Sequence, residues 1–266
     1  MRPLIALSLG GGGAKTFAHL GAIDALKEAK IPIDFLVTCS AASVIGFLVA
    51  LGVPSQEIKR EFNKRKWFRL IRRSIFKDIL KKYIKEKGIR DISQTKIPIS
   101  IVTVDLKRNE EIVFEKGDPL IIPFASSAFP GIWRPIKYKD YYLADGGILN
   151  PDPSDIARQK AGKDGIVISI TLRLEFIEEK PGNRLNVLLK AIYSLPFKRR
   201  NEIMKKNSDF IISPLKNLKI SFRDWKETFL GYFRNDKIEE FYQKGYLETK
   251  KIIPQILKKI EEKEKV

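Results

Sequence analysis

The sequence contains almost none of the residues that form disulfides and most metal sites. Among its 266 residues there is one cysteine, Cys39, and one histidine, His19. A single cysteine excludes an intrachain disulfide framework, and a single histidine leaves no Cys/His cluster for a structural zinc. We therefore expect no metal, no other cofactor and a reducing, cytoplasmic compartment.

Long uncharged hydrophobic runs are also missing. The apolar run at residues 4–9 passes directly into four glycines, and it is too short for the core of a signal peptide. No other stretch reaches 18 uncharged apolar residues, the length that a membrane-spanning helix needs. We expect a protein that does not span a membrane but can associate with its inner face.

Acidic residues are scarce relative to basic ones. The chain holds 50 lysines and arginines against 32 aspartates and glutamates, a formal net charge of +18. An excess of this size favours an anionic partner, either a phospholipid surface or nucleic acid, but does not choose between them. A lysine-rich surface that only keeps the protein soluble is the alternative.

The residues that are present alternate between strand and helix patterns. Strands are expected at 5–9 and 33–37, each followed by a helix, at 14–29 and 43–51. This order predicts an α/β fold with three α/β/α layers and a mostly parallel central sheet. No Gly/Ser linker divides the chain, which predicts one domain over residues 1–266, with a core over about 4–215 and a closing helix over about 236–263. Further strands are expected at 97–104, 111–115, 141–144, 166–171 and 210–212.

Ser40 stands at the corner between the second strand and the second helix. A sharp strand-to-helix turn lifts a serine hydroxyl above the sheet, beside the positive end of the helix. Ser40 is therefore a candidate nucleophile. The alternative is a serine that only caps an ordinary helix.

The four glycines at 10–13 lie between the first strand and the first helix. Glycines there let backbone N–H groups approach an anion or a developing oxyanion. A dinucleotide-binding fingerprint would need a glycine where Thr16 stands. A phosphate-binding loop matches Lys15 and Thr16 but would need glycines in place of Leu9 and Ala14. An oxyanion hole makes neither demand, and a tight turn without a ligand is the remaining alternative.

Asp145 ends the strand at 141–144 and is followed by Gly146 and Gly147. Carboxylates at strand ends of an α/β sheet point toward the ligand site, although Asp-Gly is also a common turn. His19 sits at helical spacing among apolar residues, which is typical of a packed helix residue and not of a catalytic base. If Ser40 is a nucleophile, Asp145 is then the best candidate for its general base.

Together these stretches resemble the patatin-like phospholipases. Gly11, Gly12 and Gly13 resemble the glycine-rich oxyanion motif of that family, residues 38–42 occupy its G-x-S-x-G elbow, and residues 145–147 its D-G-[AG] motif. Segments 125–131, Asn150 and 208–214 also look like family segments. The resemblance implies a lipid acyl hydrolase in which Asp145 accepts the Ser40 proton, the three glycines form the oxyanion hole, and an acyl-serine forms on a phospholipid or other lipid ester.

The chain departs from the family pattern at the elbow. Thr38 and Ala42 replace its two glycines, and Thr38 is expected to narrow the acyl pocket or distort the turn. One alternative is therefore a lipid-binding member with weak or no catalysis. A nucleotide binder that uses Lys15 is the alternative from another class.

Residues 64–87 combine many cations with an apolar stripe at helical spacing. Such a helix can lie in the interface of an anionic membrane, or it can pack its stripe on the sheet. Nucleic-acid binding is not expected, because no nucleic-acid module is recognisable. A second apolar and basic stretch, 185–206, fits either a lid over the site or a core helix. The membrane-surface candidates in the first stretch are Trp67, Phe68, Arg69, Arg72 and Arg73.

Overall fold

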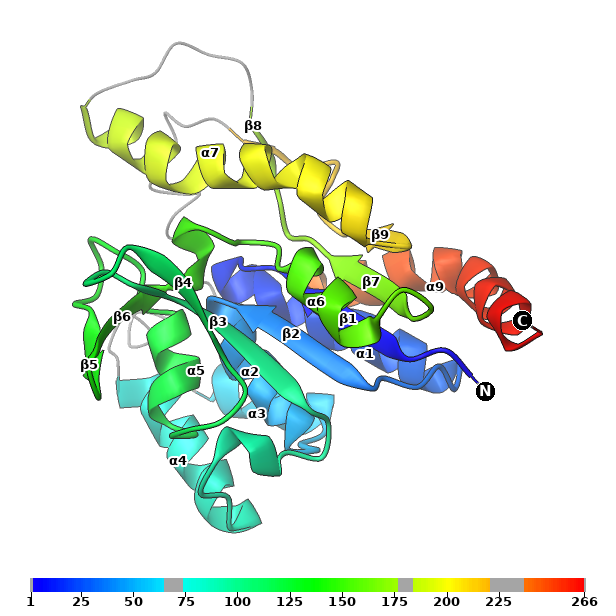
Figure 1. The fold of residues 1–266 in the computed structure, drawn as a ribbon, viewed down its shortest axis with the longest axis horizontal. Coiled ribbons are helices and arrows are strands. Elements are labelled where there is room, and N and C mark those ends of the chain that lie inside the picture. Colours follow the sequence, from blue (N-terminus) through cyan, green and yellow to red (C-terminus); the bar gives the residue numbers. More distant parts are fainter. Residues whose placement is uncertain (1, 65–73, 177–183, 221–236, 266) are drawn as a thin grey trace.

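A mixed, mostly parallel sheet lies between two layers of helices (Figure 1). The structure is a computed structural model and describes residues 2–64, 74–176, 184–220 and 237–265. In this part of the chain the sheet has eight strands, in the order β5-β6-β3-β2-β1-β7-β9 with β4 also paired to β3, and β8 and β10 form a separate parallel pair. The strands are β1 Ile5–Leu9, β2 Phe35–Cys39, β3 Ile99–Asp105, β4 Glu110–Phe114, β5 Ile136–Tyr138, β6 Tyr141–Asp145, β7 Ile166–Ile170, β8 Glu175–Phe176, β9 Phe210–Ile212 and β10 Lys219–Ile220.

Helices cover both faces of the sheet. Helices α1, α2 and α9 lie on one face, and α6, with α7 beyond it, lies on the other (Figure 1). The helices are η1 Gly13–Thr16, α1 Phe17–Glu28, α2 Ala41–Ala50, α3 Ser55–Asn63, α4 Ser74–Lys87, η3 Ile92–Gln94, α5 Ile121–Ser126, η4 Gly146–Ile148, α6 Ser154–Ala161, α7 Arg184–Asn207 and α9 Ile238–Glu264.

The strands are buried on both sides, which confirms the three-layer prediction. Along β1, Ile5, Leu7 and Leu9 join the large core under α1, α2 and α9. Ala6 between them joins a smaller cluster with Ile156 of α6. Because successive side chains of a strand point to opposite faces, this alternation requires a helix layer on each side.

The closing helix α9 meets α1 backbone to backbone. A Cβ added at Gly21 would overlap the carbonyl of Tyr242, and one at Gly245 would overlap the carbonyl of Ala18. Only glycine permits this approach. The predicted closing helix is therefore present, and it continues to Glu264 with Pro254 inside it.

Several boundaries differ from the sequence-based expectations. Strand β2 begins after Asp34, whose carboxylate accepts the N–H of Ile5 at 2.7 Å and so ends the loop there. It then continues to Cys39, and α2 follows at Ala41 and not at residue 43. Strand β5 and helix α6 were not predicted, and β4 and β6 run antiparallel to β3.

Helix α4 lies within the stretch 64–87 that was expected to be helical, and α3 lies before residues 65–73. The membrane-surface candidates Trp67, Phe68, Arg69, Arg72 and Arg73 lie outside the described residues. In α4 the side chains of Ile79, Leu80 and Tyr83 are buried in the main core, as expected of a helix that packs its stripe on the fold. Every helix in the described ranges is too short or too polar to cross a bilayer.

Candidate active site

Ser40 occupies the corner between β2 and α2. Its backbone has φ 58° and ψ −139°, a left-handed φ that a residue with a side chain rarely adopts. A strained backbone persists only where the surrounding structure holds it in place, and such positions cluster at functional sites. Ser40 is therefore fixed at the corner that the sequence predicted, with its side chain partly exposed.

Sheet register explains how Asp145 reaches a serine 105 positions earlier in the chain. Strand β2 pairs with β3 up to Cys39 opposite Val102. Strand β6 pairs with the next residues of β3 and runs the other way, so that Asp145 lies opposite Thr103. The two strand ends therefore meet at one point of β3. There the Ser40 Oγ donates a 2.7 Å hydrogen bond to Oδ2 of Asp145.

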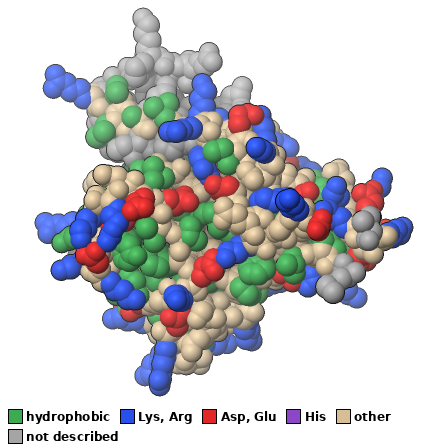
Figure 2. Space-filling model, viewed as in Figure 1, with side chains coloured by type: hydrophobic (Ala, Val, Ile, Leu, Met, Phe, Trp, Pro, Cys, Tyr) green, Lys and Arg blue, Asp and Glu red, His purple; other side chains and the backbone are tan. Residues whose placement is uncertain are grey.

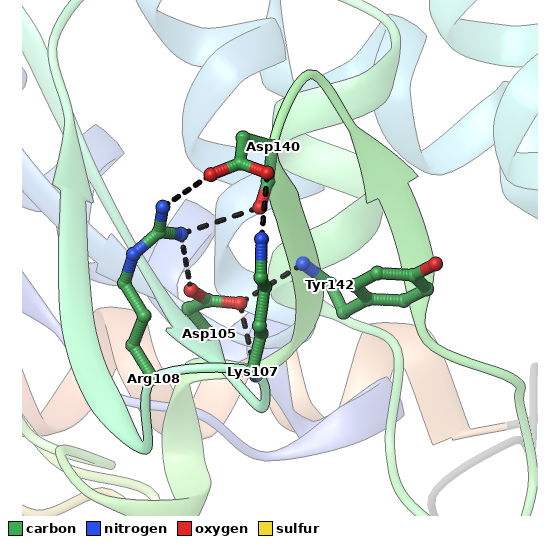
Figure 3. Close-up of polar contacts among 5 residues, drawn as sticks. All are labelled: Asp105, Lys107, Arg108, Asp140 and Tyr142. Carbon is green, nitrogen blue, oxygen red and sulfur yellow. Dashed lines mark hydrogen bonds and ion pairs between the residues drawn. The ribbon is translucent and has the colours of Figure 1, made fainter.

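A polar network holds β6 in this register (Figure 3). Asp105, at the end of β3, has no exposed side-chain surface and accepts hydrogen bonds from the N–H of Tyr142 at 2.9 Å and from Arg108 at 2.8 Å. Arg108 also pairs with Asp140 at 2.5 Å, and Lys107 pairs with the same carboxylate at 2.7 Å. The turn between β5 and β6 is thus fastened to the turn after β3, at the end of β6 away from the serine.

Asp145 is held as a buried carboxyl. Its side chain is 2% exposed, and its Oδ1 accepts the N–H of Gly147 at 2.8 Å. Burial raises the pKa of Asp145 to about 7, against the lowering effect of the hydrogen bonds from Ser40 and Gly147. Gly146 is required by close contact, because a Cβ there would overlap the carbonyl of Val102. A carboxyl that changes its protonation near neutral pH and touches a serine hydroxyl can act as a general base.

A chain of hydroxyl groups supports the serine from behind. Ser126 donates to the carbonyl of Val102 at 2.6 Å, so it must accept from Ser43 at 2.8 Å and from the N–H of Ser40 at 3.0 Å. Thr38 in turn donates to Ser43 at 3.1 Å. Sequence reasoning assigned no role to Ser43 or Ser126. The one available signal was that Ser126 lies in a segment resembling the family.

Thr38, near the end of β2, packs against α2. Its side chain has no exposed surface and turns toward α2. Its methyl Cγ2 lies 2.6 Å from the position that a Cβ on Gly46 would take. The missing side chain of Gly46 therefore leaves room for the Thr38 side chain against α2, and an effect of Thr38 on the acyl pocket stays a prediction. Ala42 is likewise fully buried in α2.

The glycine loop lies against the serine. A Cβ on Gly11 would be 3.0 Å from Cβ of Ser40, and one on Gly12 would be 2.7 Å from Cδ1 of Leu172, so a side chain at either position would force its neighbour to shift. The Gly11 N–H donates to the carbonyl of Pro151 at 2.9 Å. Gly12 and Gly13 open the helical turn η1, where the first N–H groups have no partner inside the turn.

His19 supports the glycine loop from the core. It has no exposed surface, and its Nε2 lies 2.8 Å from the carbonyl of Gly10, to which it must donate. Burial lowers the pKa of His19 to about 4, so the ring is neutral.

Lys15 is also buried, and burial lowers its pKa to about 7.

A second buried carboxyl, Asp152, lies under the same loop. Its side chain is 3% exposed and accepts from Thr171 at 3.2 Å. Its Oδ1 occupies the space that a Cβ on Gly10 would need and has no hydrogen-bond partner among the described residues. Burial raises the pKa of Asp152 to about 7. No sequence signal distinguished this residue.

Two solved structures share the fold. VipD from Legionella pneumophila aligns over 96% of this chain and 67% of its own, with a TM-score of 0.52 and 13% identity. The type III effector protein ExoU aligns over 96% of this chain and 53% of its own, with a TM-score of 0.50 and 12% identity. At these identities the likeness concerns the fold.

Sequence comparisons find closer relatives. An uncharacterized NTE family protein of Mycobacterium tuberculosis (strain ATCC 25618 / H37Rv) is 34% identical over 160 residues, 57% of this chain and 44% of the relative. Patatin-like phospholipase domain-containing protein 6 of Homo sapiens is 30% identical over 186 residues, 62% of this chain and 13% of that protein. The chain thus spans less than half the length of these curated relatives.

The family model described as Patatin-like phospholipase matches residues 7–158, which is more than half of the chain. The matched range includes the glycine loop, the strained Ser40 corner and Asp145, the three features that meet at the end of the sheet. The chain belongs to the patatin-like phospholipase family.

Proposed function

We propose that this chain is a lipid acyl hydrolase in which Ser40 is the nucleophile and Asp145 the general base. The observation that supports this most directly is the 2.7 Å hydrogen bond from Ser40 Oγ to the buried Asp145 carboxylate. The serine donates in this contact, which is the direction that proton abstraction requires. Membership of the patatin-like phospholipase family supports a lipid ester as the substrate class.

The reaction then proceeds through an acyl-serine. Asp145 takes the Ser40 proton while Oγ attacks the ester carbonyl, and the tetrahedral intermediate collapses as Asp145 returns that proton to the departing alcohol. Water, deprotonated by the same carboxylate, then releases the fatty acid and restores Ser40.

The glycine loop supplies the donors for the oxyanion in this proposal. Gly11 lies beside the serine, and the amides of Gly12 and Gly13 open the turn η1 that follows it. The Gly11 amide contributes only if it exchanges its bond to Pro151 for the substrate oxygen. Loss of one oxyanion donor costs about 10² to 10³ in rate in other hydrolases.

Labelling with a fluorophosphonate probe, combined with hydrolysis of a soluble ester and a phospholipid, tests the assignment. The wild-type chain is expected to be labelled and to turn over both esters, whereas Ser40→Ala should lose both properties. Ser213→Ala, at another partly exposed serine, is the matched control and should behave as wild type. Unchanged turnover in Ser40→Ala would refute the nucleophile.

The same experiment separates the alternatives. A wild-type chain that binds lipid vesicles but shows neither labelling nor turnover would be the catalytically inactive lipid binder. Thermal stabilisation by ATP without labelling would identify the nucleotide binder.

A further inference from the structure

The first half of α7 carries an apolar stripe that faces solvent. Val187, Leu188 and Leu195 are 47%, 54% and 57% exposed, and Ala191 is exposed as well. Spacings of three, four and seven residues place these side chains on one face of the helix. Figure 2 shows hydrophobic side chains gathered over this part of α7. We define the stripe by these four residues.

Exposed cations border the stripe at both ends. Arg184 lies one turn before Val187, and Lys198 and Arg199 lie one turn after Leu195. All three side chains are exposed and, by the same helical spacing, lie on the face of the stripe. Apolar side chains flanked by cations match the boundary of an anionic bilayer, where acyl chains lie beneath negative headgroups.

The second half of α7 is fastened to the fold. Arg200 pairs with Asp155 of α6 at 2.6 Å, and the side chain of Met204 is 4% exposed. Helix α7 also contacts η4, the turn that directly follows Asp145. The stripe therefore stands on a helix that is anchored beside the candidate base. Leu149, which follows η4, adds another exposed apolar side chain near the site, at 43% exposure.

We propose that the α7 stripe docks this protein on an anionic phospholipid surface and so brings the Ser40–Asp145 pair to its lipid substrate. The proposal names the membrane-facing surface of the site and rests on the proposed hydrolase function. A second copy of the chain is the other occupant that could cover the stripe. Packing two stripes together would bring the end cations of one copy toward those of the other in either orientation, and such like-charge contact is unfavourable.

Vesicle sedimentation of matched double variants tests the proposal. All proteins carry Ser40→Ala, so that the vesicles are not consumed. Leu188→Ser/Leu195→Ser alters the stripe, and Leu247→Ser/Leu257→Ser alters two leucines of α9 that are 57% and 38% exposed. On phosphatidylglycerol/phosphatidylcholine vesicles we expect the stripe variant to bind at least about tenfold more weakly, since it loses apolar burial. The α9 variant should bind as the parent does.

The cations give a second, independent measurement. Lys198→Gln/Arg199→Gln should weaken binding to the anionic vesicles about fivefold for each cation removed. It should leave binding to pure phosphatidylcholine vesicles unchanged. Lys258→Gln/Lys259→Gln on α9 is the matched control for charge.

The outcomes separate this proposal from the hydrolase assignment. Soluble-ester turnover and the thermal midpoint, measured with Ser40 intact, should be the same in the stripe variant and the wild type. The wild-type chain could show no ester turnover while its vesicle binding still depends on the stripe. That result would refute the hydrolase proposal and leave the docking surface standing. Equal vesicle binding by the stripe and α9 variants would overturn the docking surface. A change of oligomeric state in light scattering, confined to the stripe variant, would also overturn it and assign the stripe to a second copy.

Discussion

Asp145 and Asp152 are two carboxyls in nearly the same environment, and only one of them touches a reactive group. Both are almost fully buried, and burial raises the pKa of each to about 7. Both oxygens of Asp145 accept hydrogen bonds, from Ser40 and from Gly147. In Asp152, Oδ2 accepts from Thr171, and Oδ1 lies against Gly10.

The difference shows that a raised pKa does not by itself identify a general base. Desolvation acts on any carboxyl that the fold encloses, whatever its neighbours are. What distinguishes Asp145 is its register on β3, which places it opposite the end of β2 and within 2.7 Å of a hydroxyl. Substitution of the two carboxyls should therefore have different effects on activity but similar effects on stability.

The largest expected difference between them is in turnover. Asp145→Asn keeps the shape of the side chain but removes the proton acceptor, so we expect kcat/KM on a soluble ester to fall by at least about 10³. Asp152→Asn, the matched isosteric change, should cost less than about tenfold, because that carboxyl does not touch the serine. Equal losses in the two variants would show that buried charge near the loop, and not proton abstraction, limits the rate.

The pH profile should follow Asp145 alone. Protonated Asp145 cannot accept the serine proton, so the rate of fluorophosphonate labelling should rise through about pH 7 and fall about tenfold per pH unit below it. Asp152→Asn should leave this midpoint in place. A profile that is flat between pH 5 and 8 in the wild type would contradict Asp145 as the base.

The two carboxyls should contribute equally to the pH dependence of the free energy of unfolding. Between the ordinary carboxyl range and about pH 7 the folded chain holds protons that the unfolded chain has released, so stability falls as the pH rises through this window. Each carboxyl should lower the free energy of unfolding by about 3 kcal/mol between pH 5 and 8. Asp145→Asn and Asp152→Asn should each remove the contribution of one carboxyl to this loss of stability. Urea unfolding at pH 5 and pH 8 measures the difference. A variant with the wild-type pH dependence would place its carboxyl in a solvated environment.

The smallest expected effect concerns Gly10, which lies between the two buried groups His19 and Asp152. His19→Gln keeps an N–H donor at the position of Nε2, whereas His19→Leu leaves the Gly10 carbonyl without it. We expect His19→Leu to lower kcat about tenfold with little change in KM, and to lose about 1 to 3 kcal/mol of stability. His19→Gln should restore most of both. Failure of the glutamine to rescue kcat would mean that the ring shape matters and the hydrogen bond does not.

The sequence was sufficient to predict the layers and to single out Ser40 and Asp145, which the structure brings into hydrogen-bond contact. Repeated strand–helix order indicated the α/β fold, and the lack of a free histidine directed attention to a carboxylate base. The resemblance to the patatin-like phospholipases then pointed to Asp145. The fold prediction succeeded because it depends on local patterns, whereas the role of Asp145 as a base stays a prediction.

The remaining features depend on contacts between distant segments, which one sequence does not reveal. The direction of Thr38 is decided by the absence of a side chain at Gly46, on the next helix. The antiparallel strand β6 is held by Arg108, which bridges Asp105 and Asp140, and by the hydrogen bond from the Tyr142 N–H to Asp105 (Figure 3). Helix α6 was missed because its eight residues carry a short pattern between prolines and glycines.

The Thr38 side chain fills the space behind Ser40 that a side chain at Gly46 would need. Only one of these two positions can therefore carry a bulky residue. A strict search for glycine on both sides of the serine would therefore pass over chains of this kind, although the backbone makes the same corner. Sequence surveys of the family would recover them by asking instead whether at least one of two residues is small, the residue two positions before the serine or the residue six positions after it.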